Sequence, residues 1–312
     1  MEIIEVNSNE FSNIIQPFHK YGSVSFNELN KNKCDELFYL LFRDNKFRLG
    51  IIGGLSENVL FSPFSAPFGG FSYTTRDLRI QYLEEAIDQL SEWASLKHLD
   101  GIGITLPSIF YETNFITKQI NALWRKGFLI SKIELNHSFN LSNFDRQPHE
   151  YLWHNARKNL RIALNSGIQF VICTTDEEKE KAYDIISINR RLRGHQLKMT
   201  WSQVLATTKV LDADFFLAIS ELNEPIASAI VFHVTDLIVQ VIYWGDNGNF
   251  HEIRPMNFLA FKIFEYYKAK NFEIVDIGYS SENSVPNYGL CEFKESIGCQ
   301  AYPKYSLFKK VK

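Results

Sequence analysis

The order of the apolar segments is the feature that most constrains the fold, because the same order occurs twice along the chain. In each half, three short apolar runs follow one another with polar turns between them, which is typical of an antiparallel meander. These runs occupy residues 35–44, 46–54 and 59–61 in the first half, and 214–221, 227–232 and 237–244 in the second. The repeat predicts two modules that are built in the same way.

Each meander is followed by a helical pattern and then by another strand. Apolar residues recur at helical spacing over residues 78–93 and again over 258–267, the second stretch behind Pro255. Apolar runs at 101–106 and 272–277 then predict a strand after each helix. Each half is therefore expected to contain a strand, helices, a three-stranded meander, a helix, a strand, a helix and a final strand. We predict an α/β fold with mixed sheets and two domains, at residues 1–145 and 146–312.

Length and composition agree with a folded protein of two domains. The chain has 312 residues, of which 45% are hydrophobic and 22% charged, with 26 Phe and 14 Tyr. The net charge of -3 does not indicate a nucleic-acid-binding protein as a whole. Residues 146–198 nevertheless contain more Lys and Arg than Asp and Glu. This basic segment either receives a phosphate-rich substrate or forms a solvated helix face.

Several classes of protein are excluded by missing motifs. The four cysteines show no C-x-x-C spacing and no paired histidines accompany them, so we expect no metal site. No G-x-S-x-G, H-E-x-x-H or P-loop sequence occurs. The N-terminus lacks a signal-peptide pattern, and no apolar run reaches the roughly 18 residues of a membrane span. We therefore expect a cytoplasmic protein without stable membrane insertion, and the oligomeric state stays open.

One lysine near the C-terminus lies in an unusual setting. The apolar strand that ends at Asp276 and Gly278 is followed by a polar loop and then by the sequence GLCEFKESIG, which contains Phe293 and Lys294. A lysine placed over a developing oxyanion stabilises it, and one at a helix edge can hold a phosphate. The alternative is an exposed lysine whose stem lies on Phe293.

This segment and the repeated order resemble the FemAB/FemX-type transferases, which are tandems of two GNAT-fold N-acyltransferase units. In that family a strand ending in D-F/I-G leads to GL-x-x-FK-x-x-x-G. The helix at residues 154–170 is similar to the helix that opens the second unit of the family. The piece Pro67-Phe-Gly-Gly70, within the loop at residues 62–72, resembles the P-x-x-GG loop after the first meander.

The resemblance implies transfer of an aminoacyl group from aminoacyl-tRNA to an amine of a nucleotide- or lipid-linked peptidoglycan precursor, in cell wall biogenesis and without a cofactor. In the parent superfamily, a G-x-G/A loop holds the pyrophosphate of acyl-CoA. The corresponding linker here, residues 245–255, has no G-x-G, which argues against ordinary acetyl-CoA use. Two alternatives stay open: a transferase that uses a CoA thioester or an acyl carrier, and a catalytically silent GNAT-like binding protein.

The resemblance also implies which residues form the site. Lys294 would stabilise the oxyanion, and Asp276 would receive a proton or orient the amine, unless it only caps the following loop. The expected substrate-binding residues are Tyr243, Arg193, Arg254, Phe293, Gly69 and Gly70. Each has a structural alternative: a core tyrosine, a cation at a helix C-terminus, an arginine facing water, or glycines that only permit a turn.

Overall fold

The computed structural model describes residues 1–311, and these residues form two compact units. The first unit contains Met1–Leu135, the short segment Glu282–Val285 and the chain from Tyr302 onward. The second contains Asn136–Ser281 and Pro286–Ala301. The units thus divide the chain earlier than the predicted position at 145/146, and the first unit also takes in the C-terminal strand. The domain limits drawn from the sequence stay a prediction.

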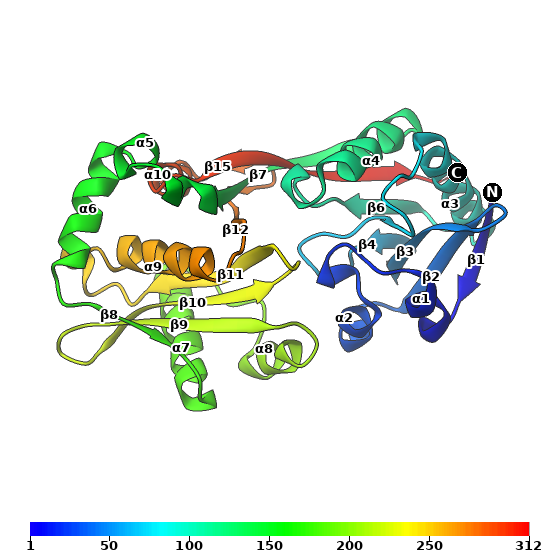
Figure 1. The fold of residues 1–312 in the computed structure, drawn as a ribbon. Coiled ribbons are helices and arrows are strands. Elements are labelled where there is room, and N and C mark those ends of the chain that lie inside the picture. Colours follow the sequence, from blue (N-terminus) through cyan, green and yellow to red (C-terminus); the bar gives the residue numbers. More distant parts are fainter. Residues whose placement is uncertain (312) are drawn as a thin grey trace. The chain divides into compact units, whose positions relative to one another are not determined.

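The first unit follows the predicted order, with additional short elements in its loops (Figure 1). Its elements are β1 Glu2–Val6, α1 Ser8–Ile14, η1 Lys20–Gly22, α2 Val24–Leu29, η2 Lys31–Lys33, β2 Glu36–Arg43, β3 Phe47–Ser56, β4 Val59–Ser62, β5 Ser72–Tyr73, α3 Ile80–Leu96, β6 Gly101–Thr105, η3 Ile109–Tyr111, α4 Thr113–Arg125 and the first part of β7 Leu129–Asn140.

The second unit repeats this order after a short helical connection. The elements from residue 141 onward are η4 Leu141–Asp145, α5 Pro148–Tyr151, α6 His154–Leu164, β8 Gln169–Ile172, α7 Asp176–Leu192, α8 Trp201–Thr208, β9 Ala213–Ile219, β10 Pro225–His233, β11 Ile238–Asp246, η5 His251–Ile253, α9 Pro255–Ala269, β12 Ile274–Tyr279, β13 Ser281–Glu282, β14 Val285–Pro286, α10 Tyr288–Ser296 and β15 Gln300–Lys310. Of these, Glu282–Val285 and β15 from Tyr302 onward lie in the first unit.

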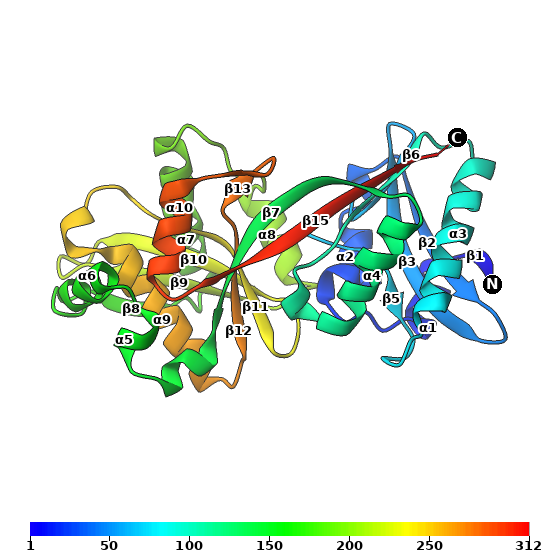
Figure 2. The same cartoon turned by 90° about the horizontal axis from the view of Figure 1, so that it is seen from above.

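The sheet of the first unit has the strand order β1-β2-β3-β4-β6-β15. Its neighbours are antiparallel except for β4 and β6, which run parallel. Helices α3 and α4 lie side by side in this unit (Figure 2). The buried face of α3 carries Leu83, Ile87 and Leu90, at the spacing that places residues on one side of a helix. These side chains pack with Ile102 of β6 in the core of the first unit.

The sheet of the second unit has the order β7-β12-β11-β10-β9-β8, with β11 and β12 parallel. Helix α9 packs on one face of the meander β9–β11 and α7 on the other (Figure 1). Because both faces are covered, β10 is almost entirely buried and reads as a continuous apolar run. The predicted repeat and the α/β fold are confirmed.

The last strand of each repeat completes the sheet of the other unit. β15 comes from the second repeat but pairs with β6 of the first unit, with Leu307 opposite Ile104. The end of β7 comes from the first repeat and pairs with β12 of the second unit, with Phe139 opposite Val275. Apolar patterning does not specify which strand is the neighbour, so the sequence did not predict this exchange.

Candidate functional site

The two parallel strands β11 and β12 separate close to the predicted site. They pair with each other at only three positions, from Ile238 opposite Ile274 to Gln240 opposite Asp276. Both strands continue beyond this point without pairing with each other. On its other side, the ladder of β12 with β7 becomes irregular between Asp276 and Tyr279. The last residues of β12 thus no longer pair with β11, while Tyr279 still pairs with Asn136 of β7, and Gly278 between them has a φ of 73°.

Lys294 of α10 binds the end of β12, at residues 277–279. Its side chain is 2% exposed. The ammonium Nζ donates to the carbonyl oxygens of Ile277, Gly278 and Tyr279, at 2.8, 2.9 and 3.2 Å. Burial lowers the pKa of Lys294 to about 8, so the group is still mainly protonated at neutral pH. The alternative of an exposed lysine whose stem lies on Phe293 is therefore wrong.

The contacts of Lys294 define what it can do chemically. An ammonium has three N–H donors, and here each has a carbonyl partner. The lysine consequently fixes the turn at the end of β12 and brings a buried positive charge to it. The roles of Lys294 as a direct donor to an oxyanion or a phosphate stay predictions.

Asp276 lies at the centre of a buried polar cluster and is 0% exposed. Its Oδ1 accepts from Asn136 Nδ2 at 2.9 Å and from the Gly278 backbone N–H at 2.8 Å, and its Oδ2 accepts from Gln240 Nε2 at 2.6 Å. A carboxylate held by three donors has a fixed orientation. Asp276 and Lys294 therefore hold the same turn from two sides, while the proton-accepting role of Asp276 stays a prediction.

Asn136 and Gln240 were not identified from the sequence. Gln240 has a detectable signal, because it is a polar residue inside the apolar run Ile238-Val-Gln-Val-Ile242. A polar side chain at a buried strand position needs a partner, and here the partner is Asp276. Asn136 has no comparable signal, because it follows a run of exposed residues in β7.

Tyr243, on β11, is half-buried, and burial raises its pKa. A backbone hydrogen bond from Met199 and the positive charge of Arg190 both act in the opposite direction on this pKa. Arg190 also lowers the pKa of Lys294. The guanidinium group of Arg190 therefore lies close enough to act electrostatically on both residues.

Arg190 is the arginine of α7 that acts electrostatically on Tyr243 and Lys294. Arg193 caps the end of α7 and is exposed. Arg190 lies about one helical turn earlier and is only partly exposed. The helical period could have identified it, because Arg190 follows Tyr183 by seven residues and shares its face of the helix. The role of Arg193 in binding a phosphate stays a prediction.

Phe293 connects α10 to β11. It is half-buried, and its ring packs edge-on against Trp244, with centroids 6.0 Å apart and an interplanar angle of 66°. Aromatic pairs in this arrangement stabilise a contact by roughly 0.5–1.5 kcal/mol beyond the burial of apolar area. Phe293 thereby holds the helix that carries Lys294 next to the strand that carries Tyr243. Its predicted contact with substrate is a separate role and stays a prediction.

Arg254 lies at the start of α9, where it is exposed and has a φ of 55°. Its carbonyl accepts from the backbone N–H groups of Asn257 and Phe258, at 3.1 and 3.3 Å, and Pro255 has no N–H. The Asn257 N–H belongs to the first turn, whose free N–H groups could bind an anion, whereas the Phe258 N–H makes the ordinary first hydrogen bond of the helix. The side chain of Arg254 is the remaining cationic group at this helix start, and its predicted contact with a phosphate stays a prediction.

Gly69 and Gly70 lie in the first unit and line a small hollow with Ser62, Tyr21 and Asn27. The Gly69 N–H donates to Thr105 O at 2.8 Å, and the Gly70 N–H donates to Ser62 Oγ at 3.1 Å. A Cβ on Gly69 would lie 2.8 Å from the backbone nitrogen of Pro63, which explains the need for glycine. The two N–H groups are thus used within the loop, and substrate binding by these glycines stays a prediction.

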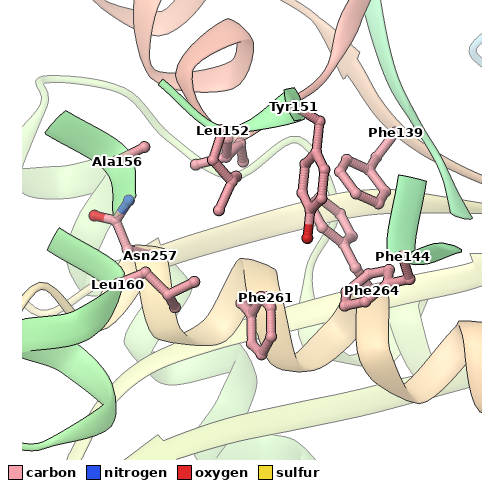
Figure 3. Close-up of a pocket in the computed structure, with 10 residues that line it drawn as sticks. Phe139, Phe144, Tyr151, Leu152, Ala156, Leu160, Asn257, Phe261 and Phe264 are labelled. Atoms are coloured by element: carbon pink, nitrogen blue, oxygen red, sulfur yellow. The ribbon is translucent and has the colours of Figure 1, made fainter. Parts of the chain in front are cut away.

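An apolar pocket of the second unit lies apart from these residues. It is lined by Phe139 of β7, Tyr151 of α5, Leu160 of α6, and Phe261 and Phe264 of α9, among others (Figure 3). No Lys, Arg, His, Asp or Glu lines it. Without an ionisable group other than Tyr151, this pocket does not offer the acid–base or charge-stabilising chemistry that acyl transfer requires.

Among residues 1–311, no group of three or more His, Cys, Asp or Glu side chains has the arrangement of a metal site. In the same part of the chain, no helix combines the length and the apolar character required to cross a bilayer.

Comparisons with known proteins extend the description of the fold. No protein-family model matches the sequence, and no curated protein matches it. Solved structures do match. The crystal structure of FemX superposes with a TM-score of 0.70 at 13% identity, covering 100% of this chain and 98% of that one.

Two further structures are similar over nearly the whole chain. L-PGS from Bacillus licheniformis has a TM-score of 0.62 at 13% identity, covering 99% of this chain and 93% of that one. A tandem GNAT protein from the clavulanic acid biosynthesis pathway has a TM-score of 0.55 at 10% identity, covering 100% and 98%. The fold is therefore the tandem GNAT-like fold that FemX also has, as the sequence predicted.

Proposed function

We propose that this protein is an N-acyltransferase of the Fem type, which transfers an aminoacyl group from aminoacyl-tRNA to an amine of a peptidoglycan precursor. The observation that carries the proposal is the buried ammonium group of Lys294 at the point where β11 and β12 separate. Likeness in fold to FemX adds to it, although a fold by itself does not define an activity.

The reaction makes one bond and breaks one. The amine nitrogen of the acceptor attacks the carbonyl carbon of the aminoacyl ester, the C–N bond forms, and the ester C–O bond breaks. The proton lost by the amine goes to the leaving ribose oxygen. The negative charge that develops on the carbonyl oxygen is stabilised by nearby positive charge. Lys294 and Arg190 would supply this charge. The Asp276 cluster would keep the turn at residues 277–279 in place.

The start of α9 favours an aminoacyl-tRNA donor over acyl-CoA. A pyrophosphate held by a helix N-terminus requires free backbone N–H groups. In this protein the first helical residue, Pro255, has no N–H, and the first-turn N–H of Asn257 donates to the Arg254 carbonyl. Aminoacyl-tRNA is a cytoplasmic molecule, and we expect the protein to act in that compartment.

The test compares donors with one acceptor mixture. Purified protein is incubated with aminoacyl-tRNA carrying a radioactive amino acid, or with radioactive acyl-CoA, and with nucleotide- and lipid-linked peptidoglycan precursors. We expect label in the precursor with the tRNA donor alone. Transfer from acyl-CoA alone would identify a CoA-dependent N-acyltransferase, and absence of transfer from both donors would favour a binding protein.

Variants of one helix connect the activity to the site. Arg190→Gln should lower the rate of transfer at least tenfold, because it removes the charge beside Tyr243 and Lys294. The matched control is Lys181→Gln, also on α7, whose side chain is paired with Glu177 at 2.7 Å. An Arg190→Gln enzyme as active as the control would remove Arg190 from the proposed site.

A further inference from the structure

The end of α7 and the loop after it form a basic segment without acidic residues. No Asp or Glu occurs between residues 185 and 211, while Arg190, Arg191, Arg193 and Lys198 lie within nine residues of one another. Arg191, Arg193 and Lys198 are exposed, and Arg190 is partly exposed. We call these four residues the basic segment.

The chain folds so that the basic segment lies on one region of the second unit. Gly194, with a φ of 75°, reverses the chain after α7, and the His195 N–H donates to the Arg190 carbonyl at 2.9 Å. The loop then returns along the helix, because the Tyr183 hydroxyl donates to the Met199 carbonyl at 3.0 Å. Lys198 directly precedes Met199 in this returning loop.

None of the four cations forms an ion pair with a carboxylate of residues 1–311. The other lysines of α7 do so: Lys179 pairs with Asp176 and Lys181 with Glu177, at 3.4 and 2.7 Å. Clustered positive charges without compensating carboxylates repel one another and attract polyanions from solution. The contrast within a single helix indicates a surface that binds an anionic partner.

The basic segment adjoins the candidate site. Helix α7 packs against β11, the strand that carries Tyr243, and the side-chain amide of Asn189 donates to the Asp246 carbonyl of β11 at 2.9 Å. Met199, at the end of the loop, makes a backbone hydrogen bond to Tyr243. An anion that binds Arg191, Arg193 and Lys198 would thus be adjacent to the residues to which we assign transfer.

We propose that the basic segment binds the phosphate backbone of the RNA donor and thereby positions its aminoacylated end at Tyr243 and Lys294. The inference rests on the proposed function and identifies the surface that the donor uses. Among residues 190–198, Leu192 is the only large apolar side chain that is exposed, at 65%. One such side chain provides little apolar surface for insertion into a lipid bilayer, which favours RNA over an anionic membrane.

The test removes the three exposed charges and leaves Arg190 in place. Arg191→Ala, Arg193→Ala and Lys198→Ala are combined in one variant. A control variant combines Lys181→Ala, Lys262→Ala and Lys268→Ala, which removes three cations of the same unit that pair with carboxylates. Thermal unfolding checks that both variants fold like the wild type.

The binding of tRNA is measured by filter retention over a series of salt concentrations. Each lost contact with single-stranded RNA should reduce the slope of log K against log salt by about 0.7. We expect a slope shallower by about 2 for the basic-segment variant, with affinity at least about tenfold weaker at low salt, and wild-type values for the control. An unchanged slope and affinity in the basic-segment variant would overturn the proposal.

Two further measurements separate this proposal from the proposed function and from membrane binding. If the wild type transfers amino acids from tRNA and the basic-segment variant has the same kcat/KM, the surface assignment fails and the proposed function stands. If the wild type binds tRNA through these residues but transfers nothing, the surface stands and the proposed function fails. Vesicles of phosphatidylglycerol that bind the wild type but not the variant, with tRNA binding unchanged, would also overturn the assignment to RNA.

Discussion

The Nζ atom of Lys294 donates a hydrogen bond to the carbonyl oxygen of Gly278 at 2.9 Å, at the residue where β12 leaves the regular strand conformation. The φ of 73° at Gly278 directs this carbonyl and its two neighbours toward one ammonium group. The arrangement therefore requires two things in different elements: a glycine in β12 and a lysine in α10.

Gly278→Ala should reduce transfer through backbone strain. No atom lies within 4 Å of the position where the new Cβ would be, so the substitution causes no clash. A left-handed conformation nevertheless costs an alanine roughly 1–2 kcal/mol, and relaxation of the turn would redirect the Gly278 carbonyl away from Lys294. We expect the free energy of unfolding to fall by about 1 kcal/mol and the transfer rate to fall with it.

The control for this substitution is Gly127→Ala in the first unit. Gly127 has a φ of 85° and no atom within 4 Å of a Cβ, so the strain is similar but far along the chain from the site. Urea unfolding should show similar losses of stability in both variants, whereas only Gly278→Ala should lose transfer activity. Equal activity in the two variants would contradict the role of the turn.

Lys294 should make the stability of the protein depend on alkaline pH. Burial lowers its pKa to about 8 from 10.5, so between these values the unfolded chain holds a proton that the folded chain has lost. The free energy of unfolding should rise with pH in this window, by up to about 1.4 kcal/mol per pH unit from this group. Below pH 8 both states are protonated, and this contribution does not change with pH.

The measurement is the difference in unfolding free energy between wild type and Lys294→Met at pH 7, 8, 9 and 10. Tyrosines and cysteines titrate in both proteins, so their contributions largely cancel in the difference. The variant should be less stable at pH 7, because three carbonyls lose their donor. The difference should widen in favour of the wild type from pH 8 to 10, and a difference that is constant over this range would contradict the lowered pKa.

Asp276→Asn should destabilise the second unit although it conserves shape. All three donors to Asp276, from Asn136, Gln240 and the Gly278 backbone, need an acceptor. An asparagine places an NH₂ group against at least one of them, and a buried donor left without an acceptor costs roughly 1–3 kcal/mol.

The control is the surface substitution Asp145→Asn, which affects an exposed pair with Lys268 and should cost less than about 1 kcal/mol. Equal midpoints of urea unfolding for the two variants would be evidence against the cluster.

The order of strands and helices could be predicted from the sequence because burial acts on each element locally. The repeat of meander, helix and strand follows from apolar spacing alone, and α9 with its buried Phe258, Leu259 and Ile263 is an example. The exchange of β7 and β15 could not be predicted in this way. Strand pairing depends on long-range register, which the apolar pattern of a single strand does not specify.

A candidate site residue can be named from the sequence where it stands out against its neighbours. Lys294 does so by its position in GLCEFKESIG, and its burial agrees with a special role. The three carbonyls that it binds could not be foreseen, because every residue has one. Arg190 was not named from the sequence, since choosing between two arginines one turn apart requires knowing which face of α7 meets β11.

His19 should destabilise the first unit at acid pH. It is 3% exposed and lies at the start of η1, where its Nδ1 accepts from the Gly22 N–H at 3.2 Å. Burial lowers its pKa from 6.5 to about 3, so between these values the unfolded chain binds a proton that the folded chain does not. The stability from this group is complete above pH 6.5 and is lost as the pH falls, by up to about 1.4 kcal/mol per unit.

His19→Asn keeps an acceptor for Gly22 but does not titrate, so the unfolding free energy of the wild type relative to this variant should fall between pH 7 and 4. An unchanged difference over this range would show that His19 is not held neutral by burial.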